Sequence, residues 1–111
     1  MIVWQKSHEM VIEVYKITNA FPESERFGLT QQVKRSVVSI AANIVEGKSR
    51  KTDKEFTAFL YTSRGSLEET RYHLLLAKDL GFISETQYDS FENKAKEVSY
   101  LLNRLITSIN K

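Results

Sequence analysis

Apolar residues recur every three or four positions along most of the chain, which is the spacing of one face of an α-helix. The first such stretch covers about residues 4–20 and the second about residues 29–46. Between them, Pro22 and Gly28 break the pattern, so residues 21–28 are predicted to form a loop. The expected buried rows are Met10, Val14, Ile17 and Phe21 beside Val11, Tyr15 and Thr18 in the first helix, and Leu29, Val33, Val37, Ile40, Ala41 and Ile44 in the second.

Two longer helices are expected to follow, each introduced by a capping signal. Thr52 and Ser84 both stand three residues before a Glu or Gln, which is the form of a capping box. Gly47 and Gly81 are expected to end the second and third helices in a left-handed conformation. The buried rows then step by four and three residues: Phe56, Leu60, Ser63, Leu67, Thr70, Leu74 and Ala77 in the third helix, and Tyr88, Phe91, Ala95, Val98, Leu102, Leu105 and Ile109 in the fourth.

Short connections between long helices force neighbouring helices to run antiparallel. A chain of 111 residues with one proline and four glycines fits one domain and offers few turns for a sandwich or barrel. We therefore predict an all-α, antiparallel, up-down-up-down four-helix bundle, a single domain over residues 1–111. Four apolar residues fall off the main rows and are expected to leave surface for self-association: Phe59, Tyr61, Leu76 and Ile106.

The residues that carry most enzyme chemistry are scarce. The chain has no cysteine and only two histidines, His8 and His73, and neither lies in the Glu-x-x-His pattern of a di-metal bundle. It also lacks a glycine-rich loop after a strand. We expect no catalysis, no cofactor and no metal site. Apolar runs are too short for a membrane span, and the N-terminus does not resemble a signal peptide, so a cytoplasmic protein is expected.

The positive charge is concentrated in one segment. The whole chain carries +2, from 16 basic and 14 acidic residues, whereas residues 34–54 carry six basic and two acidic residues, a sum of +4. Two interpretations stay open: a solvated corner between helices, or a surface that contacts nucleic-acid phosphates. No aromatic residue lies between positions 48 and 54, which disfavours base stacking there. The candidate nucleic-acid-binding residues, expected to lie around one helix–helix corner, are Lys34, Arg35, Lys48, Arg50, Lys51 and Lys54.

Small residues form a second pattern beside the apolar rows. A narrow strip of them on the second helix is interpreted as a tight helix contact: Ser36, Ser39, Asn43 and Gly47. On the third helix, Gly65 and Ser66 would cost stability in a helix interior unless they let another helix approach closely. Packing within the chain is favoured as the reason, and a contact between subunits is the alternative.

Five segments of the chain carry a recognisable family pattern. The longest is ERFGLTQQVKRSVVSIAANIVEG, and the others are VWQKSHE, EFTAFL, GSLEE and AKDLG. Together and in this chain order they resemble the four-helix-bundle proteins encoded in intervening sequences of bacterial 23S rRNA genes. Lys34 and Arg35 match two basic residues of the family motif, whereas Lys48 stands where the family often has an aromatic residue. The family is also similar to the accessory protein of diversity-generating retroelements. That likeness implies a pentameric barrel that associates with nucleic acid and with a reverse transcriptase.

The expected function is thus that of a non-enzymatic homo-oligomer, with a pentamer favoured, that binds RNA or DNA through a basic surface. The alternative is a scaffold or adaptor that recruits a partner enzyme such as a reverse transcriptase, with the cations serving only solubility.

Overall fold

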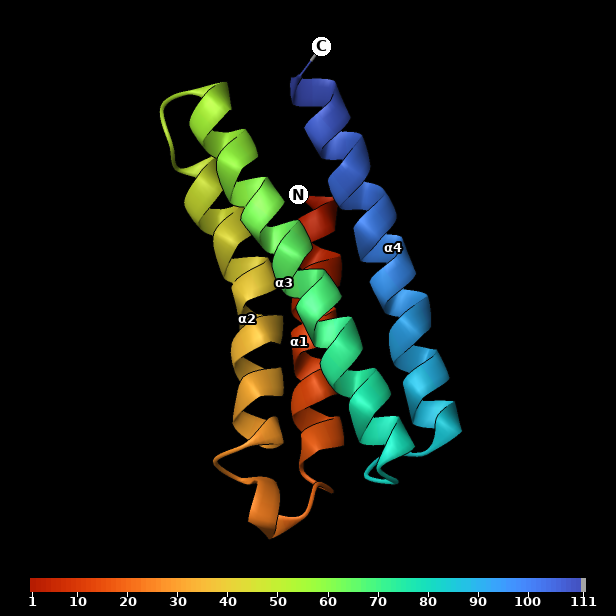
Figure 1. Ribbon diagram of the computed structural model, residues 1–111. Coiled ribbons are helices and arrows are strands. Elements are labelled where there is room, and N and C mark those ends of the chain that lie inside the picture. The colour runs from red at the N-terminus through yellow and green to blue at the C-terminus, as the bar shows by residue number, and fades with distance from the viewer. Residues whose placement is uncertain (111) are drawn as a thin grey trace.

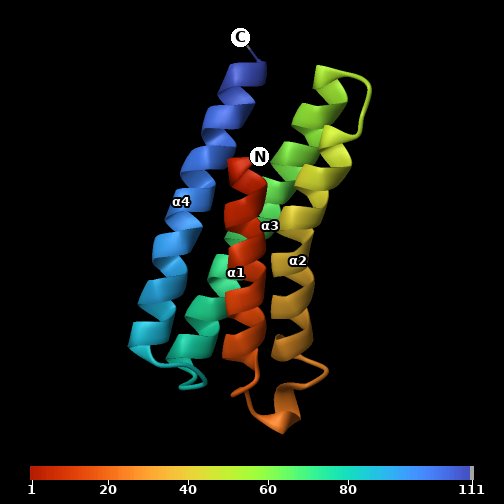
Figure 2. The ribbon, with the colours of Figure 1, turned by 180° about the vertical axis from the view of Figure 1, so that it is seen from behind.

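The computed structural model describes residues 1–110, and these residues form an antiparallel bundle of four α-helices (Figure 1). The chain runs along the bundle four times in alternating directions, and each helix packs against two others in a closed ring, as the view from behind also shows (Figure 2). The predicted all-α, up-down-up-down architecture is confirmed. In chain order the elements are α1 (Ile2–Thr18), the 3-10 helix η1 (Glu23–Glu25), α2 (Leu29–Lys48), α3 (Asp53–Asp79) and α4 (Glu85–Ile109).

The core consists largely of the predicted rows. On α3, every predicted position from Leu60 to Ala77 is fully buried, and the rows of α2 are buried from Val33 onward. Six residues of the predicted rows are only partly buried: Val11, Leu29, Phe56, Tyr88, Leu105 and Ile109. Two further positions differ more strongly from the prediction. Tyr15 is 42% exposed, so its row is only partly covered, and Ile106, expected to face outward, is 5% exposed and belongs to the core. An α-helix turns every 3.6 residues, so a strict four-three alternation drifts around it, and α4 takes a four-residue step from Leu102.

Local capping chemistry places the helix ends. The Thr52 hydroxyl accepts a hydrogen bond from the backbone N–H three residues later, and at Ser84 both halves of the capping box form. Gly81 has φ +81°, and the N–H of Phe82 donates to the carbonyl of Ala77 over 2.8 Å. These features make a Schellman motif at the end of α3, as predicted for Gly81.

Gly47 does not end α2, so that prediction is wrong. It lies inside the helix, where a Cβ would stand 2.8 Å from Cβ of Phe59 and 2.9 Å from Cδ1 of Phe56. Contacts that short force the neighbouring atoms to move. Glycine is therefore required here for the close approach of α3 rather than for a left-handed backbone.

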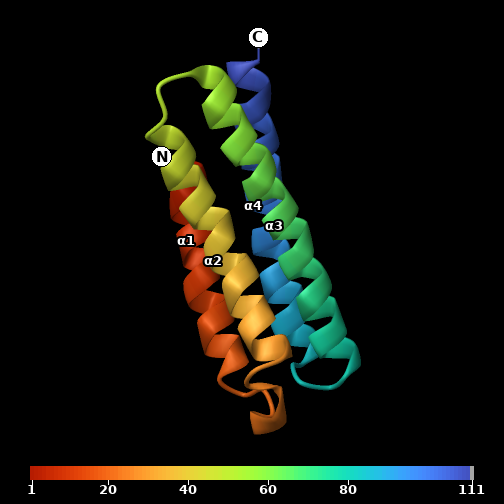
Figure 3. The ribbon, with the colours of Figure 1, turned by 60° about the vertical axis from the view of Figure 1, so that its left-hand side comes forward.

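The two ends of the bundle carry different connections (Figure 3). The turn between α2 and α3 lies at the end where α4 finishes, and the longer α1–α2 connection with η1 lies at the opposite end. The molecule measures 44 × 25 × 18 Å, so surfaces at the two ends can act separately.

Candidate nucleic-acid interface

Four of the six predicted cations lie together where α2 passes into α3, and we call this group the α2–α3 corner. Lys48 is the last residue of α2, Arg50 and Lys51 lie in the turn, and Lys54 is in the first turn of α3. All four side chains are exposed. The four-residue connection keeps these sequence neighbours close in space, as the sequence predicts.

Only one cation of the α2–α3 corner is neutralised by an ion pair. Nη2 of Arg50 lies 2.6 Å from Oε1 of Glu46, one turn earlier on α2. Within the described residues, the amines of Lys48, Lys51 and Lys54 form no ion pair. Within residues 1–110, the corner therefore presents three lysines that are not engaged in ion pairs.

Aromatic rings reach the α2–α3 corner from α3, although none lies between positions 48 and 54. Nζ of Lys48 is 5.9 Å from the ring centroid of Phe56, and Cζ of Arg50 is 4.8 Å from that of Phe59. The first two turns of α3 pack against the end of α2 and carry the rings beneath the cations. Both rings are half-buried, which fits a supporting role for the cations.

Lys34 and Arg35 do not belong to this corner, which corrects the single surface predicted from the sequence. They lie 14 and 13 residues before Lys48 on the same helix, or about 20 Å at about 1.5 Å per residue. Arg35 forms an ion pair with Glu69 of α3 and also donates to Oε1 of Gln32 from Nε at 3.2 Å. Arg35 therefore links α2 to α3, and its charge is already paired.

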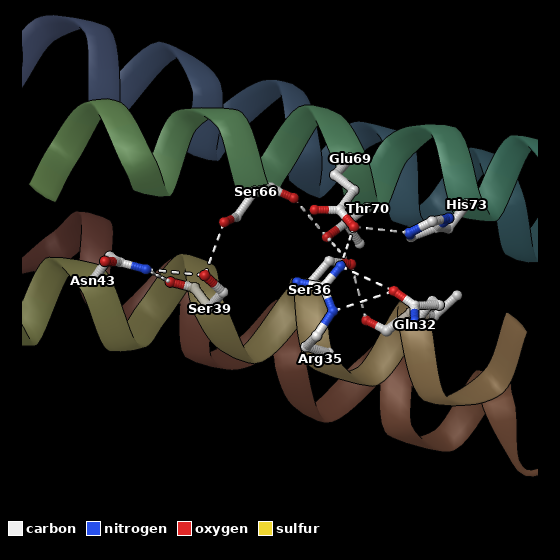
Figure 4. A network of polar contacts seen from close by, with 10 residues as sticks. Gln32, Arg35, Ser36, Ser39, Asn43, Ser66, Glu69, Thr70 and His73 are labelled. Carbon is white, nitrogen blue, oxygen red and sulfur yellow. Dashed lines mark hydrogen bonds and ion pairs between the residues drawn. The ribbon is translucent and has the colours of Figure 1, made fainter. Parts of the chain in front are cut away.

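The polar strip of α2 lies in the seam with α3 (Figure 4). The Thr70 hydroxyl donates to the Ser36 hydroxyl over 2.8 Å, and the hydroxyls of Ser39 and Ser66 are also 2.8 Å apart. The amide of Asn43 donates to the carbonyl of Ser39 one turn earlier, so it stays within α2. The predicted tight helix contact is confirmed for the two serines and for Gly47, where α3 leaves no room for a Cβ, and Asn43 supports it indirectly.

Gly65 differs from its neighbour Ser66. It is exposed, and a Cβ at this position would meet nothing within 4 Å. Packing within the chain therefore explains Ser66 but not Gly65.

Several acidic and histidine side chains pair with neighbours, some within one helix and some between helices. Nε2 of His73 lies 3.2 Å from Oε2 of Glu69, and in residues 1–110 no group of three or more His, Cys, Asp or Glu side chains is placed to hold a metal ion. Hydrogen bonding to Glu92 raises the pKa of Arg71, which fixes that guanidinium in its charged form between α3 and α4.

Over the part of the chain that the structure describes, no helix combines the length and apolar character needed to cross a membrane.

Comparison with known proteins agrees with this architecture. A solved structure with 30% sequence identity is described as a protein of unknown function from the S23 ribosomal protein family of Bacteroides thetaiotaomicron. The match has a TM-score of 0.87 and covers 94% of this chain and 97% of that one. No curated protein matches the sequence. Residues 1–104 match the family described as 23S rRNA-intervening sequence protein, so the chain belongs to that family.

Proposed function

We propose that this protein is a non-enzymatic homo-oligomer that binds RNA or DNA through the α2–α3 corner. The observation that carries the proposal is a set of three lysines around the α2–α3 connection that form no ion pair within residues 1–110: Lys48, Lys51 and Lys54. Arg50 adds a fourth cation over an aromatic ring.

Phosphate binding by such a surface is driven mainly by the release of counterions. Each phosphate that a protein neutralises contributes about 0.9 to the slope of log K against log salt for duplex DNA, and about 0.7 for single strands. One corner carries only a few cations, so one protomer would bind weakly at physiological salt. Several corners in one assembly would bind one nucleic acid together and raise the overall affinity.

Self-association is supported by apolar side chains left uncovered on the α1 and α2 side of the bundle. Ile12 is 45% exposed, Val38 39% and Val45 54%. Covering such side chains with a second copy removes apolar surface from water. Among the four residues that the sequence left off the core rows, Tyr61 is 45% exposed, while Phe59 and Leu76 are half-buried. We propose a closed ring, with a pentamer favoured by the family likeness.

The test compares two double variants that each remove two positive charges. Lys51→Gln with Lys54→Gln changes the α2–α3 corner, and Lys78→Gln with Lys96→Gln is the matched control on α3 and α4. Binding of a short duplex DNA and of an RNA stem-loop is measured by fluorescence anisotropy across a range of salt concentrations. The corner variant should lower the magnitude of the duplex salt slope by up to about 1.8 per protomer, whereas the control should keep the wild-type slope.

The proposal is wrong if neither nucleic acid binds at low salt, or if both double variants have equal effects. Either result favours the adaptor hypothesis, in which the bundle recruits a partner enzyme such as a reverse transcriptase. Light scattering on the same samples tests self-association, and a monomer at every concentration would contradict the assembly.

A further inference from the structure

A second basic surface lies at the opposite end of the bundle, where the α1–α2 connection meets both helices. It surrounds an open hollow of about 530 Å³, which we call the α1–α2 hollow. Its walls come from α1, from the residues just after η1 and from the first three turns of α2, at the lower end of the bundle in Figure 2. The lining residues that matter here are Tyr15, Arg26, Phe27, Thr30, Lys34 and Arg35.

Two aromatic rings border the α1–α2 hollow, each with a cation beside it. Phe27 is 80% exposed, the highest value among the large hydrophobic residues that the structure describes. The guanidinium of Arg26 lies 5.3 Å from its ring centroid, and Nζ of Lys34 lies 5.0 Å from that of Tyr15. A ring with a free face can stack on a base, while a neighbouring cation can meet the phosphate of the same nucleotide.

The charge of the α1–α2 hollow is also suited to an anion. Of the residues that the structure describes, three cations line it and no acidic residue does. Arg35 already forms an ion pair with Glu69. Nη1 of Arg26 lies 3.5 Å from Oε1 of Glu23, and both of these side chains are exposed. Exposed pairs of this kind are weak in water, so Arg26 remains available to a phosphate. Lys34 forms no ion pair within residues 1–110.

One polar atom beside the hollow lacks a partner. The hydroxyl oxygen of Thr30 is buried and makes no hydrogen bond within the described residues. Native proteins pair most buried polar atoms, so this hydroxyl keeps an unused hydrogen-bonding capacity at the wall of the hollow.

We propose that the α1–α2 hollow binds an unpaired nucleotide of a single-stranded RNA or DNA segment, with the base on Phe27 and the phosphates toward Arg26 and Lys34. Base faces in a duplex are already stacked on their neighbours, so this site selects single strands. The inference rests on the proposed function only in taking nucleic acid as the ligand, because it uses a different end of the molecule and different residues.

The experiment replaces Phe27 and measures three probes. Phe27→Leu keeps an apolar side chain but removes the ring, at a position where exposure leaves the fold unaffected. Binding is measured at low salt for a single-stranded RNA, a single-stranded DNA of the same sequence and the corresponding duplex. Loss of one stacked base should weaken both single strands about 5- to 150-fold and leave the duplex unchanged.

The matched control is Tyr100→Leu on α4. Tyr100 is 61% exposed, carries the guanidinium of Arg104 5.7 Å from its ring centroid and borders a hollow of about 460 Å³. Among residues 1–110, one cation lines that hollow, Arg104. The control variant therefore removes an exposed ring that stands beside an arginine, but at a place without a cluster of cations. It should bind all three probes like the wild type.

Three outcomes would overturn the inference: wild-type binding of single strands by Phe27→Leu, an equal loss for single strands and duplex, or a change of oligomeric state in light scattering without a change in affinity. The last outcome would identify the hollow as a contact between copies. The proposed function fails separately, because it is judged by the salt slope of the Lys51→Gln, Lys54→Gln variant on duplex DNA.

Discussion

Helix α3 packs against α2 on one side and α4 on the other, and the two seams are built from different chemistry. The α2–α3 seam uses small and hydroxyl side chains that let the helices approach closely, including a bond from the Ser63 hydroxyl to the carbonyl of Ile40 over 2.8 Å. The α3–α4 seam uses large apolar side chains such as Leu67 and Leu102, with an ion pair at its edge. The α2–α3 seam thus depends on how closely the two helices approach, and the α3–α4 seam on the apolar surface that it buries.

The ion pair of the α3–α4 seam has a bidentate geometry. Nε and Nη2 of Arg71 lie 3.2 and 2.9 Å from the two carboxylate oxygens of Glu92, whose side chain is only 13% exposed. Such forked pairs add directional specificity to packing that is otherwise non-directional. This difference between the seams has a consequence for stability. Adding atoms to α2 should destabilise the closely packed seam, whereas removing buried atoms from α4 should destabilise the other.

The largest effect is expected on the α4 side. Leu102→Ala should lower the free energy of unfolding by about 2–5 kcal/mol, because it removes buried methyl groups and leaves a cavity. Urea unfolding followed by circular dichroism measures the change. Leu75→Ala is the control, since it removes the same atoms from a side chain that is 37% exposed and should cost far less. Equal losses in the two variants would contradict the assigned core.

An added methyl group should change the free energy of unfolding with opposite signs at two glycines, one on α2 and one on α3. Gly65→Ala should stabilise the protein by up to about 1 kcal/mol, because alanine is the better helix former and nothing lies near the new Cβ. Gly47→Ala gains the same propensity but overpacks Phe56 and Phe59, which typically costs about 1–3 kcal/mol. We expect Gly47→Ala to be the less stable of the two in urea unfolding. If Gly47→Ala is as stable as Gly65→Ala, the seam is looser than described.

The smallest effect is a dependence on alkaline pH at the α3–α4 seam. Burial, followed by the charge of Glu92, raises the pKa of Tyr88 above its ordinary value of 10.0. The folded protein then holds this proton more tightly than the unfolded chain, so its contribution to stability is present below about pH 10 and is lost as the pH rises through the folded pKa.

Tyr88→Phe removes this titrating group, so the stability of the wild type should fall relative to that of the variant above about pH 10. Urea unfolding at several pH values measures it. Tyr72→Phe, at a ring that is 61% exposed, is the comparison. The same trend in both variants would show that the effect does not come from burial at the seam.

The candidate sites differ in how far the sequence alone could predict them. The α2–α3 corner could be found because its cations are neighbours along one short turn. The α1–α2 hollow was missed, because Tyr15 and Lys34 are 19 positions apart and meet only when α1 and α2 pack together. The sequence placed Phe27 only in the predicted loop over residues 21–28. A loop has no helical spacing of apolar residues, so the sequence could not show whether this ring is exposed or buried.

By itself the sequence determined the helices, most of their buried faces and three of their ends. These features depend on spacings of three or four residues and on capping groups within one turn, so the information is local. The tertiary structure alone decided that Gly47 lies inside α2, that Glu69 neutralises Arg35 and that Lys34 lies far from Lys48. The physical reason is that such contacts join residues on different helices, and the distances between them depend on how the helices pack, which no single segment specifies.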